Sequence, residues 1–108
     1  DSMGATGLKE GVYNFFGVDI EKRKNIAVVT KTNKLAGSTV SMHDTFCNLL
    51  KLNFSLNDVV KMTSYNAAKY LRISEIGYIG EGKKSNILVL DKNYKLKAIY
   101  LNGIKVND

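Results

Sequence analysis

A run of small residues within positions 34–42, with the sequence KLAGSTVSM, is the first candidate ligand-binding segment of this chain. It follows a strand-like run and leads into a helix-like one. Backbone N–H groups at the start of a helix have no partner within the helix, and they often bind an anion or a polar group. Ser38 or Thr39 is also a suitable N-cap for such a helix. The residues alone leave two interpretations open, a ligand-binding loop or a plain helix start.

The chain has one histidine, His43, and one cysteine, Cys47. A single histidine cannot form a multi-histidine metal site, and a single cysteine excludes an internal disulfide and a cysteine metal cage. We expect His43 on a helix surface or at an interface, and Cys47 as a small core residue. A cysteine-poor chain is typical of a reducing compartment, so we expect a cytoplasmic protein.

Three features invite a nucleotide or nucleic-acid interpretation. The glycines of GYIGEG, at 77–82, have the order G-x-x-G-x-G rather than that of the dinucleotide-binding fingerprint, so we expect a turn before a strand. The net charge is +6, but the basic residues are spread along the chain. Tyr94 and Tyr100, with lysines between them, could stack on bases, although cross-strand packing explains them equally. We therefore predict no nucleic-acid partner.

The elements around these residues follow from hydrophobic period and turn signals. Residues 12–16, 18–21 and 26–30 are strand-like, and they predict a β-meander. The period then changes to that of a helix, which begins at Ser38 or Thr39 and ends near Asn53. No apolar run approaches the ~18 residues that span a bilayer, so we predict no membrane association.

A second helix begins at Ser55, where Asp58 completes a capping-box pattern, and continues to about residue 71. Strands at 86–90, 94–101 and 104–106 follow, the last two joined by an Asn-Gly turn, the strongest hairpin signal in the chain. The predicted order is therefore β-β-β-α-α-β-β-β, an α+β arrangement without the βα alternation of a complete parallel sheet or barrel.

Several blocks, in this order and near these spacings, resemble the C-terminal third of the N-acetylglucosamine-6-phosphate deacetylase family in the amidohydrolase superfamily. The blocks are DSMGATGL, GVYNFFGVDI, LAGSTVSM, NLLKL, VVKMTSYNAAKYL and GYIGEGKKSNILVLD. The first and third single out the deacetylases, whereas the last is general to the superfamily. Two departures loosen the superfamily match: Ala67 stands where the family usually has proline, and Ser85-Asn86 replaces the usual Ala-Asp.

The resemblance implies a (β/α)₈ barrel with a small β-sandwich made from both chain ends. Asp1 matches the catalytic acid and base at the end of the last barrel strand, and Leu35, Ala36 and Gly37 match a segment that lines the sugar-phosphate pocket. A divalent metal ion, zinc or iron, would polarise the acetamide carbonyl and bound water. The aspartate would take a proton from that water and give it to the departing amine.

The family's metal ligands, a glutamate and two histidines, are absent from this chain. We therefore expect a fragment that is inactive alone, taken from an intact enzyme that acts on a small sugar phosphate as a homodimer. In this interpretation residues 1–10 and 34–76 belong to the barrel, and 11–33 and 77–108 to the β-sandwich. We also expect an incomplete barrel to leave Phe46 and Leu50 bare.

Two alternatives stay open on the sequence alone. One is a fragment of another metal-dependent amidohydrolase, acting on a cyclic amide. The other is a stand-alone basic β-rich module that binds nucleic acid or a protein.

Overall fold

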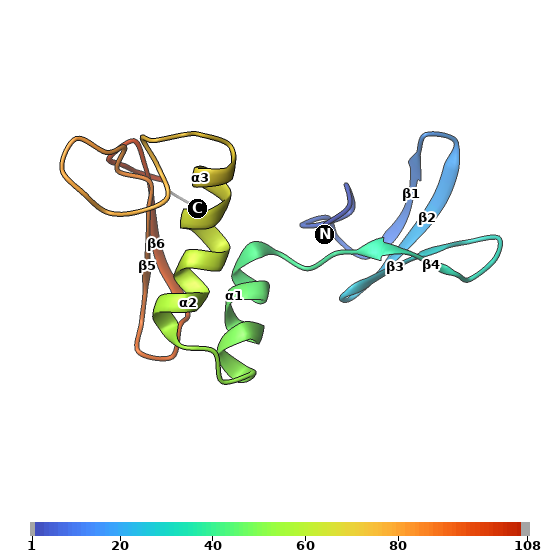
Figure 1. Cartoon of the computed structure of the whole chain (residues 1–108). Helices are drawn as coiled ribbons and strands as arrows, with labels where there is room; N and C mark the ends of the chain where they lie inside the picture. Colours follow the sequence, from blue (N-terminus) through green and yellow to red (C-terminus); the bar gives the residue numbers. More distant parts are fainter. Residues whose placement is uncertain (1, 107–108) are drawn as a thin grey trace. The chain divides into compact units, whose positions relative to one another are not determined.

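The structure, a computed structural model, describes residues 2–106 in two compact units, Asp1–Thr45 and Phe46–Asp108 (Figure 1). The first unit contains an antiparallel sheet, and the second contains helices and a second antiparallel sheet. No helix within residues 2–106 has the length and apolar character that crossing a membrane requires. The chain is thus α+β, as predicted, and the predicted grouping of 11–33 with 77–108 in one β-sandwich stays a prediction.

The sheet of the first unit is a meander of four strands in sequential order. They are β1 (Gly11–Phe15), β2 (Val18–Arg23), β3 (Ile26–Val29) and β4 (Leu35–Ser38). The three predicted strands are confirmed, but the predicted order is wrong because it omits β4. Ile20, Ala27 and Val28 are buried on this sheet, and Ala5 from the segment before it is fully buried.

The first helix, α1 (Met42–Lys51), begins later than predicted. Neither Ser38 nor Thr39 caps it, because Ser38 ends β4 and Thr39 follows it. The cap is Ser41, whose Oγ accepts a hydrogen bond from Asp44 N at 3.1 Å and donates one to Asp44 Oδ2 at 2.6 Å. This exchange satisfies one of the unpaired N–H groups of the first turn, and it fixes where the strand-to-helix connection ends.

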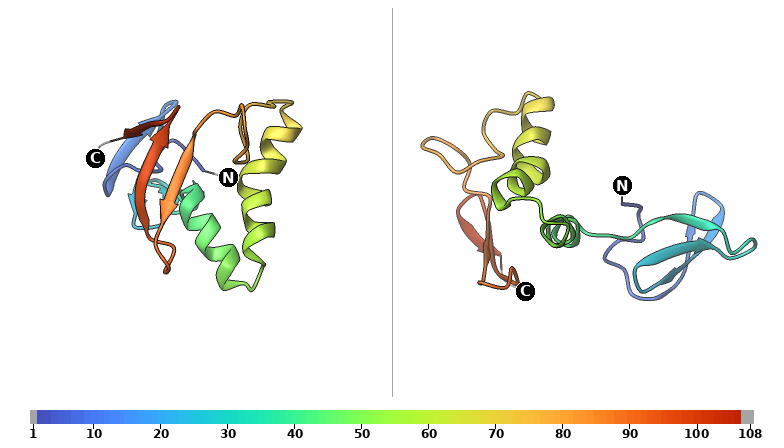
Figure 2. Two further views of the ribbon diagram at one scale, coloured as in Figure 1. Left: turned by 90° about the vertical axis from the view of Figure 1, so that its left-hand side faces the viewer. Right: turned by 60° about the horizontal axis from the view of Figure 1, so that its bottom comes forward.

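The predicted end of α1 near Asn53 is confirmed. Asn53 has a φ of 64°, and Phe54 N donates to Leu49 O at 3.3 Å, as in a Schellman motif. The chain then reverses direction, and Ser55 caps the second helical segment by accepting from Asp58 N at 3.1 Å. Figure 2 shows the two helical segments joined at this reversal as an αα-hairpin.

The second helical segment has one wide turn that the sequence did not predict. It consists of α2 (Leu56–Val60), the π-helical turn η1 (Lys61–Tyr65) and α3 (Asn66–Tyr70). The N–H of Asn66 reaches back to Lys61 O, and Thr63 Oγ1 donates to Val59 O at 2.8 Å. A residue inserted in this way rotates the rest of the helix relative to its first turn. Val59 and Ala68 are nevertheless both buried.

The second sheet confirms the predicted C-terminal strands. Its strands are β5 (Ile87–Leu90), β6 (Leu96–Leu101) and β7 (Ile104–Val106), in that order. Leu101 pairs with Ile104, and the two residues between them, Asn102 and Gly103, have φ values of 51° and 81°. Two positive values in a two-residue loop define a type I′ turn, which matches the twist of the flanking strands.

Large apolar side chains are widely exposed in both units. Phe16, Tyr70 and Ile79 each expose more than four fifths of their surface. Phe46 and Leu50 are half-buried rather than bare, and the Phe46 ring packs edge-on against Tyr94 with 5.9 Å between centroids. The prediction that Phe46 and Leu50 are bare is therefore wrong.

Candidate functional site

The predicted substrate-binding residues, Leu35, Ala36 and Gly37, lie in an edge strand rather than in a loop. In β4 the register shifts, because Gly37 pairs with Ala27 while Leu35 pairs with Val28. Ala36 is the extra residue of this β-bulge. Bulges bend a strand and redirect its side chains, and they are common next to active sites. Leu35 is 70% exposed, whereas Ala36 and Gly37 are half-buried.

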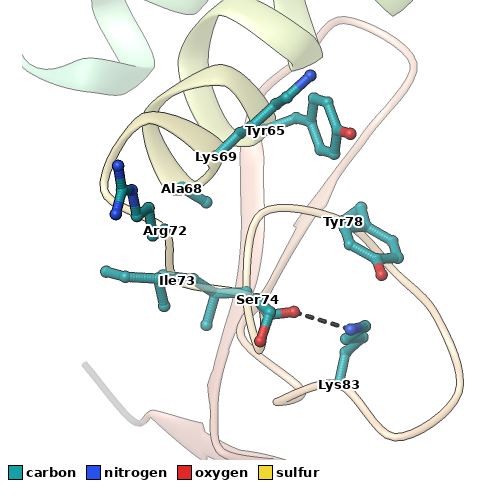
Figure 3. A pocket seen from close by; sticks show the side chains of 9 residues that line it. Tyr65, Ala68, Lys69, Arg72, Ile73, Ser74, Tyr78 and Lys83 are labelled. Carbon is teal, nitrogen blue, oxygen red and sulfur yellow. Dashed lines mark hydrogen bonds between the residues drawn. The ribbon is translucent and has the colours of Figure 1, made fainter.

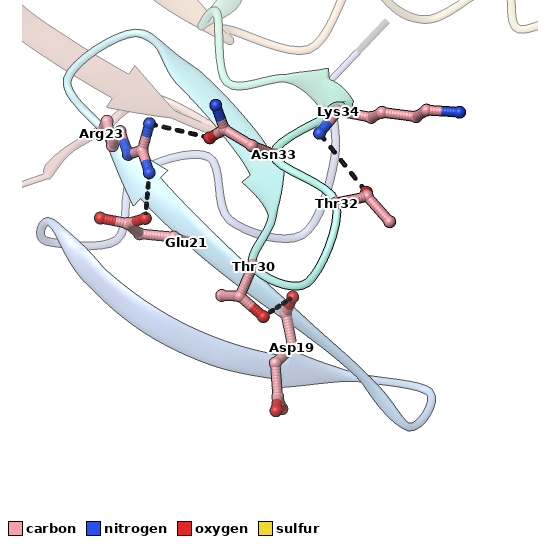
Figure 4. Close-up of polar contacts among 7 residues, drawn as sticks. All are labelled: Asp19, Glu21, Arg23, Thr30, Thr32, Asn33 and Lys34. Carbon is pink, nitrogen blue, oxygen red and sulfur yellow. Dashed lines mark hydrogen bonds and ion pairs between the residues drawn. The ribbon is translucent and has the colours of Figure 1, made fainter.

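The loop that leads into β4 is held by polar contacts (Figure 4). Thr30 N and Oγ1 both donate to Asp19 O, at 3.0 and 3.1 Å, which ties the end of β3 to β2. Arg23 Nη1 donates to Asn33 Oδ1 at 3.2 Å, and its Nη2 lies 2.5 Å from Glu21 Oε2. That hydrogen bond holds the pKa of the Glu21 carboxyl below its ordinary value. The start of β4 is thus positioned by contacts from β2.

The N-terminal segment lies along β4 and continues past its end. Met3 N donates to Ser38 O at 2.9 Å, and Ser2 Oγ donates to Val40 O. A Cβ added at Gly37 would lie 3.3 Å from Met3 Sδ and 3.4 Å from Met3 Cβ, so glycine permits this close approach. Asp1, the predicted acid and base, lies outside the described residues. Its neighbours in sequence are nevertheless bonded to the segment that follows Gly37.

Two hydroxyl groups in this unit were missed by the sequence analysis. Thr6 Oγ1 and Thr39 Oγ1 are buried and make no hydrogen bond with any residue of the described chain. Thr39 exposes only 8% of its surface, and it directly follows β4. A buried hydroxyl without a partner is costly, so each is a candidate to bind a polar group. Sequence reasoning took Thr39 for a possible cap because its burial depends on contacts distant in sequence.

Within residues 2–106 no three His, Cys, Asp or Glu side chains lie close enough together to hold a metal ion. His43 and Cys47 are both half-buried on α1, and the core position predicted for Cys47 is therefore only partly reached. The described residues do not fit a metal, and we assign none to them.

The features that suggested nucleotide or base binding serve packing and turns. Residues 77–82 lie in an irregular segment before β5, without the strand–loop–helix unit of a nucleotide site. Tyr94 adopts a positive φ of 61° in the turn before β6 and contacts Phe46. Tyr100 pairs across the sheet with Ile87 and with Lys105. Cross-strand and ring packing thus account for both tyrosines.

Comparison with known proteins gives a consistent result. The model of the Amidohydrolase family matches residues 5–106. The chain is 35% identical over 105 residues to the N-acetylglucosamine-6-phosphate deacetylase of Bacillus subtilis, and 31% identical over 97 residues to that of Lysinibacillus sphaericus. These alignments cover 95% and 89% of the chain. The chain spans about a quarter of the length of these two relatives, 26% and 25% respectively.

Solved structures of deacetylases have the same fold over this region. The N-acetylglucosamine-6-phosphate deacetylase of Thermotoga maritima matches with a TM-score of 0.83 and 25% identity, over 97% of this chain and 29% of that one. A Mycobacterium smegmatis deacetylase in complex with N-acetyl-D-glucosamine-6-phosphate matches with a TM-score of 0.79 and 27% identity, over 96% and 28%. With the family model matching nearly the whole chain, the protein belongs to the amidohydrolase family.

Proposed function

We propose that this chain is the C-terminal part of an enzyme that hydrolyses the N-acetyl group of N-acetylglucosamine 6-phosphate, giving glucosamine 6-phosphate and acetate. The observation that carries the proposal is the match of nearly the whole chain to deacetylases of that specificity. The hydrogen bonds from Ser2 and Met3 to the end of β4 support it further. They tie Ser2 and Met3 to Val40 and Ser38, which follow the predicted substrate segment.

In this proposal the Asp1 carboxylate moves the proton. It accepts a proton from the water that attacks the acetamide carbon, and it donates that proton to the nitrogen as the C–N bond breaks. One carboxylate can do both, because the two steps occur in succession at neighbouring atoms.

The segment from Leu35 to Gly37 would contact the substrate through its main chain. As an edge strand, β4 has one row of N–H and C=O groups with no strand beside it among residues 2–106. Part of this row is taken by Met3 N, which donates to Ser38 O. The bulge at Ala36 disrupts the regular ladder here, and it leaves main-chain groups for hydroxyl or phosphate oxygens of a sugar phosphate.

The amidohydrolase family is generally metal-dependent, and the metal would be held by residues outside this chain. We therefore propose that the 108-residue chain alone is inactive. We also propose that the intact enzyme is a cytoplasmic homodimer built on a (β/α)₈ barrel, with a small sugar phosphate as its partner.

A second candidate substrate is N-acetylgalactosamine 6-phosphate. The N-acetylgalactosamine-6-phosphate deacetylase of Escherichia coli O157:H7 is 27% identical over 105 residues, 95% of this chain and 28% of that protein. The two sugars differ only in the configuration at C4, so Asp1 would have the same role with either. The N-acetylglucosamine-6-phosphate deacetylases of B. subtilis and L. sphaericus are 35% and 31% identical to the chain, and these higher identities favour the first candidate.

The test is a chimera in which residues 1–108 replace the matching quarter of the B. subtilis deacetylase. Acetate release is measured on both acetylated sugar phosphates, with the isolated chain as a parallel sample. We expect the chimera to be active with a preference for N-acetylglucosamine 6-phosphate, and the isolated chain to be inactive. A chimera that folds and binds metal like its parent but releases no acetate from either sugar would contradict the proposal.

A further inference from the structure

The second unit contains a pocket of about 280 Å³ between the end of α3 and the loop that follows it (Figure 3). Tyr65 and Lys69 line it from the helical segment, and Arg72 from the turn at the end of α3. Ser74, Tyr78 and Lys83 line it from the loop. No local sequence pattern indicates this pocket, because its residues come together only through the path of the loop.

The pocket combines three cations with no acid. Lys69, Arg72 and Lys83 all line it, and none of its lining residues is an aspartate or glutamate. Glu75 is the nearest acid in sequence, and it forms an ion pair with Lys84 at 2.5 Å. Within the described chain, Lys69 and Arg72 form no ion pair. No acid of residues 2–106 therefore neutralises their charges.

The loop holds Lys83 at the pocket. Lys83 Nζ donates to Ser74 O at 2.8 Å and lies 5.0 Å from the centre of the Tyr78 ring. An ammonium group has three donors, so this carbonyl leaves donors for another acceptor. Arg72 has a φ of 57° in the turn that ends α3, where Ile73 N donates to Ala68 O at 2.9 Å. The position of Arg72 is thus set by a Schellman motif rather than by a flexible tail.

One wall of the pocket is aromatic and apolar. The rings of Tyr65 and Tyr78 meet edge-on, with 6.0 Å between their centroids and 70° between their planes. Ala68 and Ile73 add apolar surface. Edge-to-face pairs are a favourable ring geometry, and this one joins the helix to the loop. A ligand that pairs a charged group with a flat apolar part matches such a lining.

We propose that this pocket binds a small organic phosphate. Arg and Lys are the usual phosphate-binding side chains, so a dianion beside Lys83 would also be attracted, over a longer range, by Lys69 and Arg72 at other sides of the pocket (Figure 3). The C-terminal end of a helix carries about half a negative charge and therefore repels an anion, but the positive charges of Lys69, Arg72 and Lys83 outweigh it. The volume of about 280 Å³ lies at the small end of ligand pockets, which suits a phosphate with one small ring and is too small for a nucleic-acid strand.

The test is an NMR titration of the 108-residue chain with inorganic phosphate and with phenyl phosphate at constant ionic strength. We expect amide shifts confined to residues 65–83 and tighter binding of phenyl phosphate. The double variant Lys69→Gln/Arg72→Gln should raise the Kd of phenyl phosphate at least fivefold. Both residues are exposed, so the variant should keep the spectrum of the folded chain.

The matched control is Lys92→Gln/Lys95→Gln, which removes the same charge from an exposed turn between β5 and β6. It should change the Kd less than twofold. If the two double variants raised the Kd of phenyl phosphate equally, binding would depend only on net charge, and the proposal would be overturned. Shifts spread over the chain, or no saturable binding of either phosphate, would overturn it as well.

Discussion

At Gly77 the loop after α3 passes close to the helix, and an added methyl group has no room there. A Cβ at this position would lie 2.7 Å from Ala68 Cβ and 3.3 Å from Tyr65 Cα. Carbon atoms in contact normally lie about 3.5–4.0 Å apart, so the overlap with Ala68 is close to 1 Å. Gly77 also has a φ of 97°, which L-residues with a Cβ rarely adopt.

The loss of folding free energy caused by Gly77→Ala follows from the steric overlap and the left-handed backbone. The left-handed backbone contributes about 1–2 kcal/mol, and overpacking contributes about 1–3 kcal/mol. The sum, about 2–5 kcal/mol, is a large part of the 5–15 kcal/mol by which a typical domain is stable. We expect the variant to lower the urea midpoint of the second unit sharply or to prevent its folding.

The assay is urea unfolding followed by circular dichroism, with Gly82→Ala as the matched control. Gly82 has a φ of 72° and nothing within 4 Å of an added Cβ. Gly82→Ala therefore measures the cost of the left-handed backbone without steric overlap. Combining Gly77→Ala with Ala68→Gly should recover part of the loss, even though glycine in a helix costs about 1 kcal/mol. Equal destabilisation by Gly77→Ala and Gly82→Ala would refute the steric argument.

Three further predictions concern the cap, the close approach at β4 and a turn aspartate. Ser41→Ala should lower the free energy of unfolding by about 1 kcal/mol, because Asp44 N loses its acceptor. Denaturant titration measures this loss. The control Ser64→Ala removes an exposed hydroxyl within the helix and should change the free energy of unfolding little. Gly37→Ala should destabilise the parent, because the new Cβ would contact Met3, and it should be neutral or stabilising when Met3→Ala is also present. Additive effects of the two substitutions on the free energy of unfolding would contradict this contact. Hydrogen bonds from Lys95 N and Asn93 N hold the pKa of Asp91 below its ordinary value. A depressed carboxyl pKa stabilises the fold above the unfolded pKa of about 3.9, and this is lost as pH falls through the lower folded pKa. The thermal midpoint of the parent should therefore fall between pH 6 and pH 2 by more than that of Asp91→Asn, and an equal fall in both would contradict it.

Local signals predicted most of the elements. The Asn102-Gly103 turn, the capping box at Ser55 and the stop at Asn53 each depend on residues close in sequence, and all three are confirmed. The alternation of the N-terminal strands likewise depends only on neighbouring residues. Where local chemistry decides the structure, a single sequence is sufficient.

The features that were missed depend on distant partners. The segment from Leu35 to Ser38 contains no β-branched residue, and it becomes a strand because it pairs with β3. This pairing ends at Ser38 and therefore moves the helix start to Ser41. The burial of Thr39 and the pocket around Lys83 also arise from contacts that no local pattern encodes.

The central claim is that Asp1 transfers the proton in amide hydrolysis, and Asp1→Asn in the B. subtilis chimera tests it most directly. The amide keeps the size of the side chain but cannot accept a proton from water. We expect kcat for acetate release to fall by about 10²–10⁴, the usual contribution of general acid–base catalysis, with little change in KM or metal content. A kcat within twofold of the unsubstituted chimera would contradict the account.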